Sequence, residues 1–252
     1  MKKNVLKTFL AMITVCSVIF VGCASSEDDS TPSVNYGASG SGSVPEFVAN
    51  SVIKNKVVNI NGSTDVYYEY LTFTTDSAGT YAVYKDIDGT LTKQESITFG
   101  DVVVNFPTEF TFDKATGKFT AGETSTYMVN AKKSGKEVYA IAGEILTTAS
   151  ENKSSLMNEW TSESGECFNF MADGTVAFTD AIGEKVTLAF ANKDGWILIA
   201  ESVPLLWAKQ GEVYNLYYPI YETERTTVDA EGRMAVAEDS VDLVSNRFLL
   251  VR

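Results

Sequence analysis

The chain of 252 residues contains no histidine. Histidine is the usual general acid or base near neutral pH, the middle member of nucleophilic triads and a frequent zinc ligand. Without it, catalysis depends on carboxylates or lysine, and the sequence contains no glycine-rich phosphate loop or nucleophile elbow. The sequence therefore predicts a protein that is not an enzyme and binds no cofactor, with a carboxylate-based hydrolase as the enzymatic alternative.

Cysteine is also rare, since only Cys16, Cys23 and Cys167 occur. The first two lie in or directly after an apolar N-terminal run, so the body of the chain holds Cys167 alone and no internal disulfide is expected. A single cysteine within a strand pattern is usually a small buried hydrophobic residue. A reactive exported thiol is the alternative.

Positive charge is scarce, with 20 lysines and arginines against 33 acidic residues and a formal net charge of -13. This excess of negative charge repels phosphate backbones, which excludes nucleic acid as a partner. It also opposes adsorption to anionic lipid, so attachment to a membrane needs an anchor other than surface charge.

The N-terminus is basic, with the sequence MKKNVLK, and is followed by the mostly apolar run TFLAMITVCSVIFVG and then Cys23. This order is typical of a secretory signal peptide, which we expect over residues 1–22. The run is shorter than the about 20 apolar residues of a membrane span, and a true anchor helix is the alternative.

The stretch Phe20-Val21-Gly22-Cys23 resembles the lipobox of bacterial lipoproteins, with Phe20 where leucine is most usual. The resemblance implies cleavage before Cys23, a diacylglycerol on its sulfur and acylation of its new amine, such as with palmitate. Two or three acyl chains hold a protein stably on a membrane. We therefore expect a protein anchored in the cell envelope, at the outer membrane, facing the periplasm or the cell surface. The acidic cluster 26–29 resembles surface-display signals of some lipoproteins, and a solvated linker explains it equally well.

Residues 23–45 lack apolar periodicity and are rich in serine, glycine and acidic residues, which predicts a flexible tether. The body is predicted to form two β modules, residues 46–150 and 151–252. A weak internal repeat supports this division, because YLTFTTDSAGTYAVY at 70–84 parallels CFNFMADGTVAFTD at 167–180. The alternative is that unrelated hairpins resemble each other.

From residue 46 onward, apolar residues alternate with polar ones and are separated by turn signals such as Asp88-Gly89, Ser134-Gly135 and Asp194-Gly195. Period-two alternation with aromatic and β-branched residues is typical of strands, and Asp-Gly turns are typical of hairpins. We expect an all-β fold of antiparallel hairpins and meanders that forms one or two barrels. Short helices are predicted only at 46–56 and 150–160.

The second half carries a further resemblance, to small bacterial lipocalin-like domains, over residues 158–252. The residues that carry it are Trp160 at the opening strand and the hairpin residues Phe168, Phe170, Asp173, Gly174 and Thr175. Asn158 stands where these domains favour glycine. The resemblance implies an up-and-down barrel, in which Arg247 or Arg252 packs on the tryptophan.

Three tryptophans, Trp160, Trp196 and Trp207, are the candidate ligand-binding residues, because small barrels can hold one ligand in an apolar interior. Large aromatic side chains on strands usually fill the core, and we favour that interpretation over a ligand pocket for these side chains and for Tyr214, Tyr217, Tyr218 and Tyr221.

No metal site is expected. Asp86 and Asp88 form a fragment of a calcium loop, but a hairpin turn explains them. The pairs Glu222–Glu224 and Glu238–Asp239 have the spacing of chance acidic neighbours on a solvated face rather than of a glycosidase pair.

Together these features predict a lipid-anchored envelope protein of binding type. It would hold a small hydrophobic ligand, or an envelope or macromolecular partner, on a β-barrel scaffold. The alternatives are a structural or adhesive surface lipoprotein with a solid β core, and a carboxylate-based hydrolase of envelope sugars.

Overall fold

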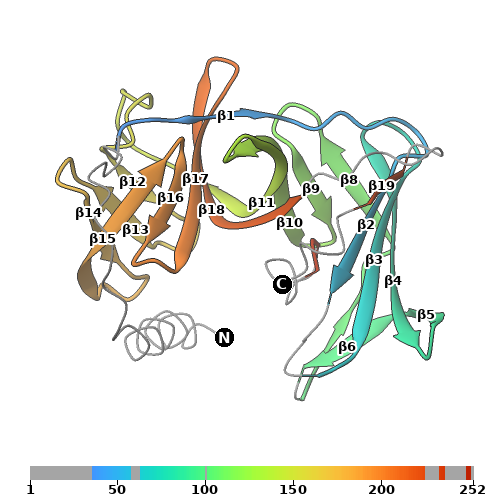
Figure 1. Cartoon of the computed structure of the whole chain (residues 1–252). Helices are drawn as coiled ribbons and strands as arrows, with labels where there is room; N and C mark the ends of the chain where they lie inside the picture. Colours follow the sequence, from blue (N-terminus) through green and yellow to red (C-terminus); the bar gives the residue numbers. More distant parts are fainter. Residues whose placement is uncertain (1–35, 58–62, 100, 225–232, 236–247, 251–252) are drawn as a thin grey trace, which may run out of the picture. The chain divides into compact units, whose positions relative to one another are not determined.

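The computed structural model describes residues 36–57, 63–99, 101–224, 233–235 and 248–250 (Figure 1). Within these ranges the chain is all-β, with 19 strands and no helix, and it contains a closed five-stranded β-barrel with additional strands. The all-β class and the barrel predicted from period-two alternation are therefore confirmed. The predicted signal peptide 1–22 and the lipidation residue Cys23 lie outside the described residues. No helix in the described part of the chain is long and apolar enough to cross a membrane.

Two compact units divide the chain, and neither is continuous in sequence. Unit 1 contains Ile145–Ala208 and Val213–Leu216 together with the residues up to Gly40. Unit 2 contains Ser41–Glu144, Lys209–Glu212 and Tyr217–Arg252. The second half of the chain thus contributes to both units.

Unit 1 is built on a meander in which each strand pairs antiparallel with the next. Its strands are β12 (Glu159–Thr161), β13 (Cys167–Phe170), β14 (Thr175–Thr179), β15 (Lys185–Lys193), β16 (Trp196–Ile199) and β17 (Val203–Gln210), the last two residues of which belong to unit 2. Alternate side chains are buried, for example Phe168 and Phe170 on β13 and Val176 and Phe178 on β14. Strand β18 (Val213–Glu224) begins in unit 1 and continues in unit 2.

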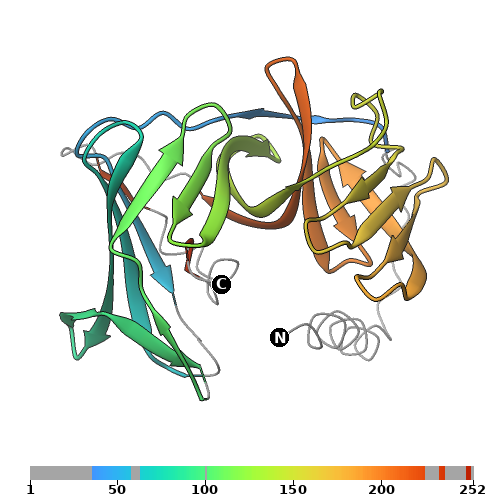
Figure 2. The same cartoon turned by 180° about the vertical axis from the view of Figure 1, so that it is seen from behind.

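Unit 2 is a larger, mostly antiparallel sheet. Its strands are β1 (Gly40–Ser43), β2 (Val52–Val57), β3 (Val66–Phe73), β4 (Ala78–Ile87), β5 (Thr90–Gln94), β8 (Glu109–Asp113), β9 (Lys118–Ala121), β10 (Thr124–Lys133), β11 (Lys136–Leu146) and β19 (Arg233–Ala235). The first residue of β1 and the last two residues of β11 belong to unit 1. The pairing runs β2–β3–β4–β8–β9–β10–β11, with β5 also on β4, β1 on β10, and β19 parallel to β2. Strands β6 (Ser96–Phe99) and β7 (Val102–Asn105) form a separate hairpin. The long strands β3 and β4 lie side by side in both views (Figure 1 and Figure 2).

The hairpin turns follow the predicted dipeptides. Asp88 and Gly89 have positive φ angles of 52° and 81°, and Ser134 and Gly135 have 51° and 81°. Two consecutive positive φ angles characterise the type I′ turn, whose twist matches that of the flanking strands. The Asp86 carboxylate accepts a hydrogen bond from the Gly89 amide at 2.8 Å, so this aspartate caps the turn.

The two predicted helices are wrong. In the first, Val52–Val57 form β2, and Ile53, Asn55 and Val57 are buried in alternation, a period that a helix cannot satisfy. In the second, residues 150–158 form turns in which serine and asparagine side chains bond to nearby backbone groups. Such local hydrogen bonds compete with helix formation.

Part of the predicted tether is ordered. Gly40–Ser43 form β1, in which Gly42 pairs with Ala131 of β10. Glycine and serine have weak strand propensity, but a ladder needs only their backbone groups, which is why composition did not indicate this strand. The Tyr36 ring meets Phe190 edge to face in unit 1, with ring centroids 5.1 Å apart.

Candidate functional site

The candidate tryptophans lie in unit 1, and the structure brings two of them together. Trp160 and Trp207 are 2% and 0% exposed, and their ring centroids are 5.2 Å apart. Trp207 also stacks on Tyr214 at 5.2 Å. The Trp160 Nε1 donates to the Leu156 carbonyl at 3.0 Å. These rings pack on one another, as the core-filling alternative predicts.

The third tryptophan and the tyrosines are placed differently. Trp196 is half-buried at the start of β16, where it pairs in register with Leu206. In unit 2, the Tyr217 hydroxyl donates to Gln210 Oε1 at 2.8 Å. Tyr218 is buried, and the side chain of Tyr221 lies outside the described residues.

The hairpin that resembles lipocalin-like domains uses its acidic residue for the turn. The Asp173 carboxylate accepts hydrogen bonds from the Thr175 hydroxyl at 2.6 Å and the Thr175 amide at 3.0 Å, which lowers the pKa of Asp173. Arg247 and Arg252, predicted to pack on Trp160, lie outside the described residues.

The remaining candidates from the sequence show no assembled chemistry. Burial and the neighbouring Glu159 carboxylate raise the pKa of Cys167, which disfavours a reactive thiolate. No group of three or more histidine, cysteine, aspartate or glutamate side chains that could hold a metal ion occurs in the described ranges. The side chains of Glu222 and Glu224 and the pair Glu238–Asp239 are not described.

A fully buried acidic residue that the sequence did not single out lies in unit 2. Glu69 is in the middle of β3 and is 0% exposed. Its partner across the β2–β3 ladder is Asn55, also 0% exposed, whose Nδ2 donates to Glu69 Oε2 at 2.9 Å. The two polar side chains therefore interrupt an otherwise apolar face of the sheet.

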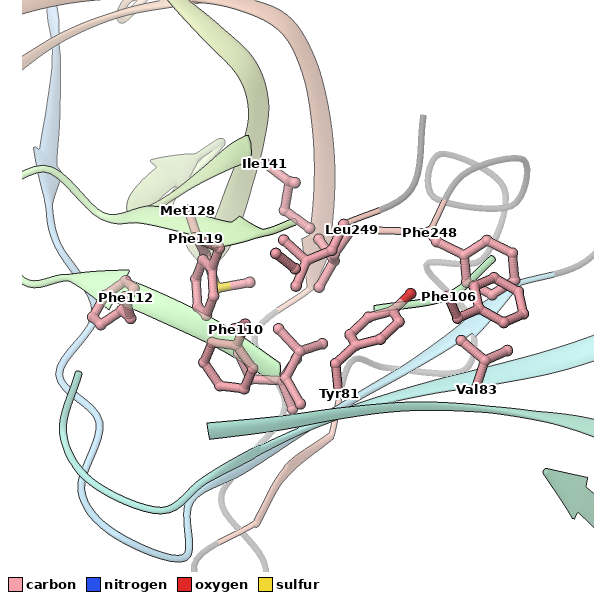
Figure 3. Close-up of a cluster of buried hydrophobic side chains, with 14 of the residues drawn as sticks. Tyr81, Val83, Phe106, Phe110, Phe112, Phe119, Met128, Ile141, Phe248 and Leu249 are labelled. Atoms are coloured by element: carbon pink, nitrogen blue, oxygen red, sulfur yellow. The ribbon is translucent and has the colours of Figure 1, made fainter. Parts of the chain in front are cut away.

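The other partners of Glu69 come from the C-terminal residues of the chain. The backbone amides of Leu249 and Leu250 donate to Glu69 Oε2 at 2.8 Å and Oε1 at 3.3 Å. Phe248, Leu249 and Leu250 are 4%, 5% and 1% exposed and belong to the hydrophobic core of unit 2 (Figure 3). A carboxylate with one oxygen on each of two consecutive amides thus fixes this short segment in the core.

The electrostatics of Glu69 are unusual for a core position. Burial raises its pKa, and the hydrogen bonds from Leu249, Asn55, Tyr81 and Leu250 only partly offset that effect. These hydrogen-bond donors are all neutral. The described residues provide Glu69 with no cationic partner, and a buried carboxylate without one is costly, so Glu69 marks a candidate site.

Two further polar atoms accompany the Glu69 carboxylate. Asn55 Oδ1 is buried and has no hydrogen-bond partner among the described residues, and the buried Tyr81 hydroxyl lies against the Glu69 carboxylate. Burial and the nearby Glu69 carboxylate raise the pKa of Tyr81 well above its usual value. We call Asn55, Glu69 and Tyr81 the polar cluster. Its side chains provide hydrogen-bond donors and acceptors around one ionisable carboxyl group.

The strand pattern contained a signal for this cluster. In VYYEYLTF, Glu69 occupies the same face as Tyr67, Leu71 and Phe73, which are all buried. A charged residue in phase with buried aromatics is a departure from binary patterning. The pattern locates Glu69 on the core face but contains nothing about the backbone amides that meet it.

Comparison of the chain with protein-family models, with curated proteins and with solved structures finds no match, and the functional proposal therefore rests on the residues described above.

Proposed function

We propose that this chain is a lipid-anchored, non-enzymatic protein of the cell envelope that binds a partner on its β scaffold. The anchor is the lipidated Cys23, and the membrane is the outer membrane of a bacterium. The support for the anchor is the basic start, the apolar run and the lipobox-like Phe20–Cys23. The partner is a small hydrophobic ligand or an envelope macromolecule.

The observation that carries the binding part of the proposal is the polar cluster in unit 2. A scaffold that is only packed has no need of a fully buried carboxylate, because an apolar side chain of similar volume fills the space without the desolvation cost. Glu69 instead meets two backbone amides of a segment 180 residues away in sequence. This arrangement is suited to holding a chain segment.

A structural or adhesive surface lipoprotein is the second candidate, and the filled cores favour it. The rings of Trp207 in unit 1 and of Phe73 and Phe119 in unit 2 are 0% exposed. Side chains packed in this way stabilise a fold whether or not it binds anything.

Anchoring is tested by replacing Cys23 with serine and following palmitate labelling and membrane fractionation in bacteria. We expect labelling and membrane association to disappear, whereas Cys16→Ser, within the predicted signal peptide, should leave both unchanged. Unchanged labelling of Cys23→Ser would contradict the lipoprotein proposal.

Binding is tested by native mass spectrometry of residues 24–252 purified without detergent from bacterial cells. A co-purifying lipid, metabolite or peptide of defined mass supports the binding function and identifies the ligand class. A bare polypeptide mass, with no mass shift on addition of extracts of the cell envelope, favours the structural candidate.

A further inference from the structure

The segment Phe248–Leu250 is buried in unit 2 in the way a bound peptide is buried in its receptor. All three side chains are at most 5% exposed, and none lies in a described strand. The Phe248 ring meets Phe106 at a centroid distance of 5.1 Å (Figure 3). It also meets the Tyr67 ring at 6.0 Å. The segment therefore contributes a large apolar surface to a core made by residues far away in sequence.

The hydrogen bonds to this segment are made to its backbone amides rather than to its side chains. Glu69 accepts from the amides of Leu249 and Leu250, which every residue except proline provides. In peptide recognition, main-chain hydrogen bonds supply affinity, and pockets for side chains supply specificity. Here the apolar surroundings of Phe248 and Leu249 are the pockets.

The polar cluster has more hydrogen-bonding capacity than the present occupant uses. Asn55 Oδ1 can accept a hydrogen bond and has no partner among the described residues, and the Tyr81 hydroxyl, which lies against the Glu69 carboxylate, can accept a further one. Buried polar atoms are normally satisfied, so an unpartnered amide oxygen beside a buried carboxylate points to a site built for a ligand. The same cluster already holds two amides of a peptide, which indicates the class of ligand.

We propose that unit 2 contains a capture site for a short apolar peptide segment and that residues 248–250 occupy it as an internal ligand. The site takes two consecutive backbone amides on Glu69 and three large apolar side chains in the surrounding core. When the internal segment is absent, the site accepts the same kind of segment from outside the chain. The inference rests on the binding part of the proposed function and is independent of the lipid anchor.

The test uses residues 24–252 lacking only the last five residues, 248–252, and a fluorescent synthetic peptide with the sequence of residues 245–252, SNRFLLVR. Fluorescence anisotropy should show saturable binding to the shortened chain. The intact chain, whose site is occupied, should bind at least tenfold more weakly. Circular dichroism first establishes that the shortened chain is folded.

Two matched controls distinguish capture at this site from nonspecific hydrophobic binding. A peptide N-methylated at the residues equivalent to Leu249 and Leu250 keeps every side chain but lacks the two amide hydrogens, and its affinity should fall at least tenfold. Glu69→Leu in the shortened chain should cause a similar loss, whereas Lys93→Leu, on the exposed strand β5, should not. Equal affinity for the methylated and unmodified peptides would overturn the proposal, as would no binding to a folded shortened chain.

The intact chain provides the test if the shortened chain does not fold. Hydrogen exchange at the amides of Leu249 and Leu250 should become at least tenfold faster in excess unlabelled peptide, because the free peptide replaces the internal segment. Unchanged exchange at saturating peptide would overturn the proposal. Neither peptide binding nor hydrogen exchange depends on acylation or on a co-purifying ligand. A negative result in these experiments therefore contradicts peptide capture without contradicting the lipid anchor or the binding of another ligand.

Discussion

Both units use a buried polar side chain to hold a segment that is far away in sequence, but they do so with opposite polarity. In unit 1, Asn192 is 2% exposed, and its Nδ2 donates to the carbonyls of Tyr36 at 3.0 Å and Ala38 at 2.8 Å. In unit 2, Glu69 accepts from the amides of Leu249 and Leu250. The amide group is neutral at every pH, whereas the carboxylate is ionisable. Only the second attachment can therefore respond to protonation.

The surroundings of the two attachments differ as well. In unit 1, Asn192 Oδ1 accepts from the Gly195 amide at 2.9 Å. In unit 2, Asn55 Oδ1 is left without a partner among the described residues. The attachment in unit 1 therefore has both ends of its amide group hydrogen-bonded, while that in unit 2 retains an unused hydrogen-bond acceptor, as a binding site does.

The largest expected effect is in the core of unit 1. Trp207→Ala should reduce the free energy of unfolding by about 3–5 kcal/mol, because a fully buried ring is replaced by a cavity. Trp196→Ala, at a half-buried position, should reduce the free energy of unfolding by only about 1 kcal/mol, because a half-buried ring buries less apolar area on folding. Urea denaturation followed by circular dichroism measures both. Equal losses would contradict the assignment of Trp207 to a packed core.

A smaller loss is expected where the N-terminal segment crosses the turn between β15 and β16. A Cβ on Gly195, whose φ is +88°, would lie 2.1 Å from the Gly40 backbone nitrogen and 2.2 Å from the Trp207 carbonyl oxygen. Gly195→Ala should therefore cost about 2–4 kcal/mol through overpacking and backbone strain.

Gly183→Ala is the matched control for Gly195→Ala. Its φ is +92°, but a Cβ there meets nothing within 4 Å. Gly183→Ala should therefore reduce the free energy of unfolding only through backbone strain, by about 1 kcal/mol in the same denaturation experiment. A similar loss for both variants would show that the close approach of Gly40 contributes nothing to the stability of unit 1.

The two attachments can be broken one at a time. Glu69→Leu and Asn192→Leu should each cost about 1–3 kcal/mol, because buried backbone groups lose their hydrogen bonds while the side-chain volume is kept. Hydrogen exchange read by mass spectrometry should be faster in peptides containing residues 248–250 for the first variant and residues 36–40 for the second. The same response in both variants would remove the distinction between the two attachments.

The smallest effect is a difference in pH dependence. Burial raises the pKa of Glu69 in the folded state, so the carboxyl contributes its full stability below its unfolded value of about 4.3, and that contribution is lost as pH rises through the raised folded pKa. The stability of the wild-type chain relative to Glu69→Leu should therefore decrease between about pH 4 and the folded pKa. Asn192→Leu should follow the wild-type pH profile, and urea midpoints measured across this range provide the check. A wild-type advantage over Glu69→Leu that grows with pH would contradict a raised pKa.

The sequence predicted the features of the fold that depend on residues close together in the chain. The alternation from residue 46 onward predicted strands, of which β3 and β15 are examples, and the Asp-Gly dipeptides predicted turns, because both depend on residues a few positions apart. It failed at 46–56, where Ile53, Asn55 and Val57 form an alternating strand with a polar residue in the middle. Strand β1 was missed because its pairing uses only backbone groups.

The candidate site depended on information that no local pattern contains. Trp160 and Trp207 were recognisable as large aromatic residues, but whether they line a pocket or pack on each other is decided by strands 47 residues apart. Glu69 was in phase with buried residues, yet its partners lie 180 and 181 residues away in sequence. A short segment such as Phe248–Leu250 has no periodicity that predicts where in the fold it packs.

The attachment of Tyr36 and Ala38 to Asn192 has a consequence for where the protein can work. If Cys23 is acylated, only 13 residue-to-residue steps lead from Cys23 to Tyr36, the first described contact with unit 1. A chain of this length spans at most about 43–47 Å when fully extended. Acylation of Cys23 would therefore keep unit 1 within that distance of the bilayer, and a partner of this unit would have to approach the membrane surface to meet it.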